Sequence, residues 1–306
     1  MSKLSGVKKF IQTTLEIPQR RTDGDLVKGT HPYRKLMPYI MPGRNESVCY
    51  YDDYIRSDKM LDYIERARAA FGTDVNITHL LVAAASNTLH QNPTMNQFIS
   101  GSRLYRRKNV DVTFSMKRKK LNKKAKLSAV KMRMDEPEES FQDLVERINS
   151  HIHIERSGRK TSVDQELDIL SLLPRRLMTG VVSTVNWLDY NNILPKLFME
   201  QDGFYTSMFI ANLGSLGMRP AFHHLYEYGN CPLFLMVGRI EERPMVRDGV
   251  VVAENIMHIR WSYDERIDDG LSSNYGMTTF REALEDPDQF FGELPEVPAK
   301  LKTAVA

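Results

Sequence analysis

Residues Trp261–Ser273 read WSYDERIDDGLSS and join a strand-like opening to a cluster of charged side chains. Four of the seven residues from Asp264 to Gly270 are acidic, and one is an arginine. Carboxylates grouped this closely can act as general bases in catalysis, and they can equally hold a solvent-exposed turn. The residue types alone leave both roles open.

A second candidate for chemistry is the basic segment Lys117–Lys126, which reads KRKKLNKKAK. Charge runs of this kind usually face water, so a solvated hairpin loop is one interpretation. The other is an anion site, for the phosphates of a cofactor or for an acidic partner chain. Aromatic residues that stack on bases are not interleaved with the lysines, so no nucleic-acid partner is expected.

The paired histidines do not have the pattern of a metal site. His223 and His224 are adjacent in sequence, so their side chains diverge on a strand or in a turn. No second set of ligand residues at metal spacing accompanies them. His151 and His153 fall at the end of an expected helix. We therefore expect solvated histidines and no bound metal.

The composition is that of an ordinary globular chain: 42% of the 306 residues are hydrophobic, enough for one large or two small domains. The net charge of +3 creates no overall field that would favour nucleic acid. The longest apolar runs, such as PLFLMVG, are far shorter than the ~20 residues of a membrane span. With no secretory signal and only Cys49 and Cys231, we expect a cytoplasmic protein with no membrane partner.

The elements that must position these residues are inferred from periodicity and turn signals. The helix expected over residues 76–93 is apolar nearly all round, which predicts burial. Pro137 and its acidic neighbours favour the start of a helix over residues 135–152. The other elements expected in the first half are strands over 47–55, 103–118 (two strands) and 126–132, and a helix over 57–72.

In the second half, residues 161–198 are expected to be mostly helical, with breaks at Pro174 and Gly180. After Gly203 the pattern changes to strands, and the pair Asp248-Gly249 between two alternating runs predicts a tight hairpin. A helix over residues 278–291 closes the chain. Helices followed by a strand-rich half indicate one mixed α+β domain.

The motifs of the second half follow one another in a recognisable order. IANLGSLG, PLFLMVGRIEERPMVRDGVVV, IRWSYDERIDDG and a terminal helix ending LEDP resemble the end of the acyltransferase core of 2-oxo-acid dehydrogenase complexes. That family is related in fold to chloramphenicol acetyltransferase. Upstream, HLLVAAASNTLHQNPTMN, KNVDVTFSM and SFQDLVERI resemble further segments of the same core, so the resemblance covers roughly residues 30–290.

The resemblance implies an α+β two-layer sandwich of the chloramphenicol acetyltransferase-like type, in which a mixed sheet packs against helices. It also implies homotrimers with active sites at subunit interfaces, and it is compatible with a dehydrogenase-complex or acyl-carrier partner. Whether the trimers assemble further, into larger cages, is left open by the sequence. We expect an N-terminal extension over residues 1–30, a core domain over 31–292 and a tail over 293–306. Lipoyl and peripheral-subunit-binding domains are expected to be absent.

The resemblance also assigns a role to the charged cluster. In the family, the motif Asp-His-Arg-x-x-Asp-Gly supplies a histidine that takes the proton from the thiol of coenzyme A or dihydrolipoamide. This chain matches the motif at Arg266, Asp269 and Gly270, but Glu265 stands at the histidine position. In the family an arginine from early in the chain pairs with the motif aspartate, and Arg34 is the candidate for that arginine here.

The second family motif is altered as well. In ISNLG of the family, a serine or threonine hydroxyl donates a hydrogen bond to the tetrahedral oxyanion, and the matching residue here is Ala211. Asn212 and Gly214 match the turn that follows and are expected to support its shape. Alanine cannot donate to an oxyanion, and the loss of one such donor costs about 10²–10³ in rate.

These residues are compatible with two functions, one of them catalytic. The first is a catalytically silent trimeric subunit with a structural or accessory role and no required cofactor. The second is a coenzyme A-dependent acyltransferase in which Glu265 acts as the base. In that case the basic residues Lys117, Arg118, Lys119 and Lys120 would contact the coenzyme A phosphates.

Overall fold

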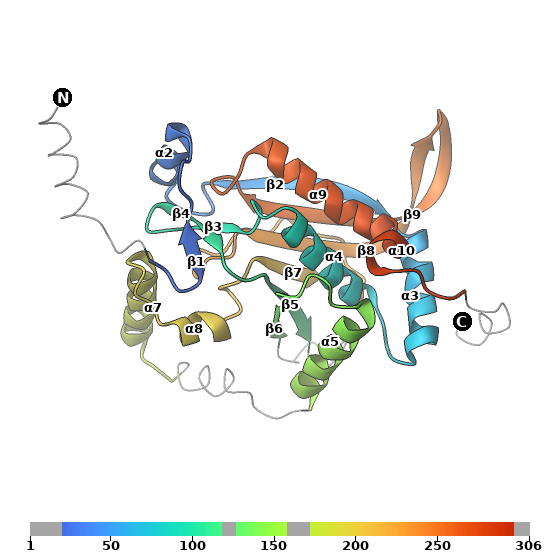
Figure 1. Cartoon of the computed structure of the whole chain (residues 1–306), viewed down its shortest axis with the longest axis horizontal. Helices are drawn as coiled ribbons and strands as arrows, with labels where there is room; N and C mark the ends of the chain where they lie inside the picture. The colour runs from blue at the N-terminus through green and yellow to red at the C-terminus, as the bar shows by residue number, and fades with distance from the viewer. Residues whose placement is uncertain (1–19, 118–126, 158–171, 297–306) are drawn as a thin grey trace, which may run out of the picture.

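A six-stranded mixed sheet with the strand order β2-β9-β8-β7-β5-β6 forms the centre of the molecule (Figure 1). The computed structural model describes residues 20–117, 127–157 and 172–296. The pairs β5–β7 and β7–β8 are parallel, and the other neighbouring pairs are antiparallel. The strands are β2 (Val48–Arg56), β5 (Asp111–Lys117), β6 (Leu127–Arg133), β7 (Met208–Asn212), β8 (Leu233–Arg247) and β9 (Val250–Asp264).

Helices cover one face of this sheet and bury the main core (Figure 1). Side chains alternate between the faces of a strand, so Trp261 of β9 points to the helices, where its ring packs edge-on against Phe280. The helices of this layer are α3 (Asp58–Phe71), α4 (Ile77–Gln91), α5 (Phe141–Arg156), α9 (Gly270–Glu285) and α10 (Pro287–Phe291). The predicted two-layer α+β fold is confirmed, as is the burial of α4.

A small second sheet, with strand order β1-β4-β3, joins the N-terminal part of the chain to the body. Its strands are β1 (Gly24–Leu26), β3 (Gln97–Ser100) and β4 (Arg103–Arg107). The buried Arg21 bonds the carboxylates of Asp23 and Asp189 at 2.8 and 2.7 Å. Residues 21–26 therefore belong to the fold, although the sequence placed them in an extension that ended at residue 30.

The remaining elements lie beside the main sheet, and they include α7, which Figure 1 shows at the left of the molecule. They are α2 (Pro32–Ile40), α7 (Arg175–Tyr190), α8 (Lys196–Gln201) and the short 3-10 helix η1 (Gly214–Leu216). In the part of the chain that the structure describes, no helix is long and apolar enough to cross a membrane.

Three helix boundaries differ from those predicted. The helix expected from residue 135 begins at Phe141, because the Ser140 side chain accepts a hydrogen bond from the Asp143 amide and caps it there. Gly180 lies inside α7 and does not break it. The last long helix begins at Gly270 and not at residue 278, because Asp269 is its N-cap.

The predicted hairpin between β8 and β9 is confirmed. Asp248 and Gly249 have φ angles of +50° and +80°, the left-handed values that a two-residue turn of this kind requires. The strands pair along most of their 15 residues, and the hairpin tip projects beyond the body of the molecule (Figure 1). β9 returns to the body and ends at Asp264, where the charged cluster begins.

Candidate active site

The charged loop after β9 is built on a buried ion pair. The guanidinium of Arg266 bonds both oxygens of Asp264 at 2.8 Å, and the two side chains are 3% and 1% exposed. Arg266 also donates to the carbonyls of Met41 and Pro42, and Ser47 donates to Asp264. These bonds tie the loop to the segment before β2 and satisfy both buried charges. Two of the cluster's charges are therefore structural.

Glu265, at the position of the family histidine, is half-buried and points to the first strand of the sheet. Its amide donates to the Ser47 carbonyl, and its carboxylate accepts a hydrogen bond from the Cys49 thiol, with Sγ and Oε2 3.3 Å apart. Burial, and then this carboxylate, raise the pKa of Cys49 to about 11. The carboxylate therefore stabilises a protonated thiol of its own chain.

Asp269 caps the helix that follows the loop. Its side chain accepts a hydrogen bond from the Ser272 amide at 2.8 Å, and this bond lowers the pKa of Asp269. Arg34 does reach the loop, but its Nη1 donates to the carbonyls of Glu265 and Arg266, each at 3.3 Å. The expected Arg34–Asp269 pair is thus replaced by bonds to the main chain. Gly270, the first residue of α9, has open space around it.

Ala211 lies on β7, on the face of the sheet that the helices leave uncovered. Its methyl group packs in a small apolar cluster with Phe209, Phe234 and Met236. Glu265, by contrast, contacts Cys49, whose strand neighbour Tyr51 packs against the main core on the helix side. The two altered family positions therefore face opposite sides of the sheet, and one chain does not bring them together.

The turn after Ala211 has the shape that its motif requires. Asn212 accepts a hydrogen bond from the Ser215 amide at 3.1 Å, and its amide group donates to the Thr78 hydroxyl at 3.2 Å. A Cβ atom at Gly214 would lie 2.4 Å from the carbonyl oxygen of Gly238. Only glycine lets η1 approach β8 this closely, because a side chain would meet main-chain atoms.

The remaining candidates form no site in the described part of the chain. Lys117 is the last residue of β5, and Arg118, Lys119 and Lys120 lie outside the described residues. The ring of His223 stacks on those of Phe234 and His224, with the centroids 4.0 and 4.7 Å apart. The prediction that the two histidine side chains diverge is therefore wrong. The described residues contain no group of histidine, cysteine or carboxylate side chains arranged to hold a metal ion.

Sequence reasoning missed two residues of this region. Cys49 carried no signal, because its contact with Glu265 depends on the pairing of β2 with β9, in which Cys49 lies opposite Tyr263. Ser115 lies opposite Ala211 on β5, so a hydroxyl-bearing residue is present one strand away. The register of these strands could not be read from the sequence.

Comparison with known proteins agrees with the resemblance that the motifs indicated. Residues 200–292 match the family described as 2-oxoacid dehydrogenases acyltransferase (catalytic domain). A stretch of 60 residues is 37% identical to the dihydrolipoyllysine-residue succinyltransferase component of the 2-oxoglutarate dehydrogenase complex from Cupriavidus necator. That stretch is 20% of this chain and only 14% of the Cupriavidus protein.

Solved structures extend the likeness over most of the chain. A probable dihydrolipoamide acetyltransferase from Listeria monocytogenes superposes with a TM-score of 0.57 at 14% identity, over 86% of this chain and 95% of the other. The dihydrolipoamide acetyltransferase of Azotobacter vinelandii gives 0.56 at 17% identity, over 86% and 94%. The cubic core of a pyruvate dehydrogenase multienzyme complex gives 0.54 at 15% identity, over 84% and 88%.

The chain has the fold of an acyltransferase core. The likeness to the 2-oxo-acid dehydrogenase acyltransferases that the motifs indicated is therefore confirmed, and residues 200–292 carry the sequence pattern of their catalytic domain. Within this acyltransferase core fold, the loop after β9 is held by the Arg266–Asp264 pair and the turn after β7 by Asn212 and Gly214. Their side chains at positions 265 and 211 are a carboxylate and a methyl group.

Proposed function

We propose that this protein is a catalytically silent member of the acyltransferase core type, serving as a homotrimeric structural or accessory subunit of a dehydrogenase-type assembly. The observation that carries the proposal is the engagement of Glu265. Its carboxylate stands at the histidine position of the family motif and accepts the hydrogen bond of its own chain's Cys49 at 3.3 Å. The residue that would have to take a proton from an incoming thiol is therefore already bound to the thiol of Cys49.

The basicity of the groups and the expected loss of rate support catalytic silence. A free thiol has a pKa of about 8.5, an imidazole about 6.5 and a glutamate about 4.3, so the carboxylate is the weaker base by about two units or ~3 kcal/mol. General bases contribute about 10²–10⁴ in rate, and one oxyanion donor about 10²–10³. Losing both, at Glu265 and Ala211, lowers a typical turnover of about 10 per second to roughly 10⁻³ per second or less.

A role in assembly is supported by apolar surface that a single chain leaves uncovered. On α2, Tyr39 and Ile40 are 68% and 64% exposed. On α7, Leu177 and Trp187 are 57% and 60% exposed, and Asp189 is the single buried residue of this 16-residue helix. Exposed apolar surface of this kind marks interaction sites. The related pyruvate dehydrogenase structure is the core of a multienzyme complex, and a comparable assembly is our proposal here.

The separation of Ala211 and Glu265 agrees with a trimer. They face opposite sides of the sheet, so they could share a site only if neighbouring copies contributed one each. Work on the Azotobacter vinelandii acetyltransferase concerns a serine, a histidine and an asparagine in its catalytic mechanism, the last two being four positions apart. Glu265 and Asp269 have the same spacing here.

One observation favours a second function, an active coenzyme A-dependent acyltransferase of altered chemistry. The Glu265 carboxylate accepts a hydrogen bond from the Cys49 thiol, and a base for coenzyme A would need the same contact with the coenzyme A thiol before it takes the proton. Ser115, opposite Ala211, would then be a source of the missing hydroxyl, and the basic segment from Lys117 would meet the coenzyme A phosphates.

Acyl transfer from acetyl-coenzyme A or succinyl-coenzyme A to dihydrolipoamide separates the two functions. The purified chain and its Glu265→Gln variant are compared at equal concentration, with Glu242→Gln, on the projecting hairpin, as the control for loss of one carboxylate. A silent subunit gives the background rate with all three proteins. Turnover by the chain that falls at least tenfold in Glu265→Gln but not in the control would establish the second function and overturn the first.

A further inference from the structure

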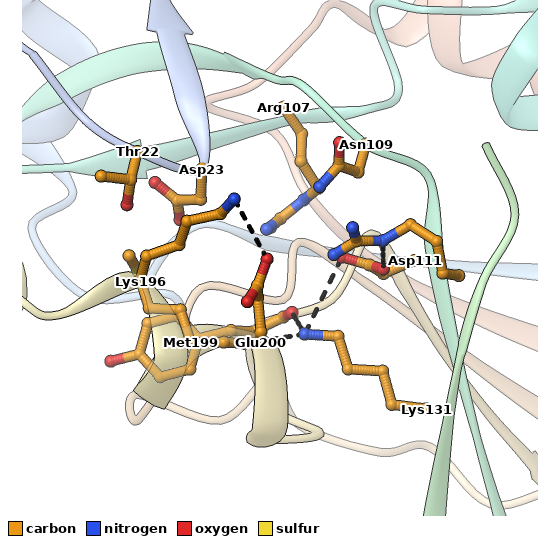
Figure 2. Close-up of a pocket in the computed structure, with 11 residues that line it drawn as sticks. Thr22, Asp23, Arg107, Asn109, Asp111, Lys131, Lys196, Met199 and Glu200 are labelled. Carbon is orange, nitrogen blue, oxygen red and sulfur yellow. Dashed lines mark hydrogen bonds and ion pairs between the residues drawn. The ribbon is translucent and has the colours of Figure 1, made fainter.

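Helix α7 is fixed to the body of the molecule along one side. Val185 packs against a small apolar cluster that includes Met199 of α8, and the buried Arg21 bonds the α7 residue Asp189 at 2.7 Å. Lys131 of β6 in turn donates to the Met199 carbonyl at 2.8 Å (Figure 2). Asp189 is the single buried residue of the 16-residue helix. The opposite face of α7, at the left edge of the molecule in Figure 1, is therefore exposed on a firmly held helix.

That exposed face carries one stripe of side chains with a symmetric order. Residues three and four apart share a helix face, so the stripe consists of Arg176, Gly180, Ser183 and Trp187, all of them exposed. Gly180 follows Arg176 by four residues, and Ser183 precedes Trp187 by four. A cation and a large ring therefore stand at the two ends of the stripe, with two small residues between them.

Three of these residues are unfavourable on a single chain in water. The Trp187 side chain is 60% exposed. Arg176 lies in the first turn, at the positive end of the helix dipole, and that turn holds no acidic residue. Gly180 weakens the helix, and a Cβ atom there would meet nothing within 4 Å, so no contact in the described part of the chain requires a glycine. A second molecule on this face would offset all three.

We propose that α7 binds α7 of a second copy of this chain, with the two helices antiparallel. Arg176 of each copy then lies on the Trp187 ring of the other, and Gly180 lies opposite Ser183. The charges are complementary, because an aromatic face attracts a guanidinium and the partner helix ends here with carbonyls of partial negative charge. The small residues let the two helices approach closely at the centre of the contact.

This pairing deepens the proposed role in assembly, and its consequence for the trimer rests on that proposed function. A cyclic trimer is built from heterologous contacts, in which two different surfaces meet, whereas α7 against α7 is a two-fold contact. In a homotrimer the α7 pairs therefore lie between trimers and join them into a larger assembly.

Analytical ultracentrifugation of the parent chain, Arg176→Glu and Arg175→Glu tests the pairing. Arg175 is the matched control, because it is also exposed and lies in the same turn but not on the stripe. Both variants place an anion at the N-terminus of α7, which favours the helix. We expect the mass of the main species to fall at least twofold in Arg176→Glu and to stay unchanged in Arg175→Glu. Gly180→Leu should lower the mass as well, although leucine is the better helix former.

The same runs separate the pairing from the homotrimer. A parent species of two or more trimers that falls to one trimer in Arg176→Glu supports both. A pair of chains that falls to a single chain supports the pairing and overturns the trimer. A parent trimer that neither Arg176→Glu nor Gly180→Leu changes overturns the pairing alone, and a parent that sediments as a single chain overturns both.

Quenching of tryptophan fluorescence by acrylamide gives a second readout. Of the two tryptophans, Trp187 is 60% exposed and Trp261 is 0% exposed, so quenching in the unpaired chain comes from Trp187. Dilution of the parent chain should increase quenching, because it separates the pairs and uncovers the ring, whereas Arg176→Glu should be fully quenched at every concentration. Protection of Trp187 that survives dilution in Arg176→Glu would show that the same chain covers the ring, and would overturn the pairing.

Discussion

Replacing Arg266 by methionine removes one half of the buried ion pair that holds the loop of Glu265. The Arg266 and Asp264 side chains are 3% and 1% exposed, and the guanidinium makes four hydrogen bonds of 2.8–3.0 Å to Asp264 and to two main-chain carbonyls. Breaking such a pair leaves Asp264 charged and buried, which costs about 3–5 kcal/mol. For a domain of this size that is a fall in Tm of about 10 °C.

The assay is urea unfolding followed by circular dichroism, with the midpoint and slope compared among variants. Lys59→Met is the matched control, because its pair with Asp286 is 66% and 45% exposed and such surface pairs contribute about 0–1 kcal/mol. The double variant Arg266→Met with Asp264→Leu should recover part of the loss, since it leaves no buried charge alone. A loss below about 1 kcal/mol in Arg266→Met would refute the structural role of the pair.

Three further outcomes are expected. Gly214→Ala should destabilise the chain by about 1–3 kcal/mol in urea unfolding, because its Cβ would lie 2.4 Å from a carbonyl oxygen, whereas Gly180→Ala, in open space, should not. Iodoacetamide should modify Cys49 slowly at pH 8, where only about 0.1% of the thiol is thiolate, and faster with each pH unit towards its pKa of about 11. The reaction at pH 8 should be faster in Glu265→Gln, because a carboxylate that raises this pKa is gone. A rate that stops rising below pH 9 in the parent chain would contradict the raised pKa. Trp187→Asp should shift the chain to smaller species in analytical ultracentrifugation, and an unchanged mass would exclude α7 from the interface.

Much of the fold could be predicted because local signals and tertiary packing agree. Gly72 ends α3 in the left-handed conformation that favours glycine, as its place after an amphipathic pattern predicts. The Asp248-Gly249 pair fixed the hairpin for the same reason. Where a local signal had two uses, the predicted helix boundary was wrong. Asp269 was assigned to a catalytic loop, yet it is also a helix cap, so α9 begins eight residues earlier than expected.

The site could be predicted only in part, because its key contacts depend on strand register. The motif positions of Glu265 and Ala211 were read directly from the sequence, whereas the contact of Glu265 with Cys49 was not. Their placement on opposite faces of the sheet follows from pairings such as Cys49 with Tyr263 and Ala211 with Met236. A shift of the strand pairing by one residue would move each of these side chains to the other face of the sheet, and short-range sequence patterns do not exclude such a shift.

The turnover number of the unaltered chain with acyl-coenzyme A and dihydrolipoamide tests the central claim most directly. With a carboxylate at 265 engaged by Cys49 and a methyl group at 211, we predict a rate of roughly 10⁻³ per second or less. The variant Ala211→Ser with Glu265→His, measured in parallel, should be faster than the parent. A parent rate of about 1 per second or more would be ordinary for an enzyme and would contradict catalytic silence.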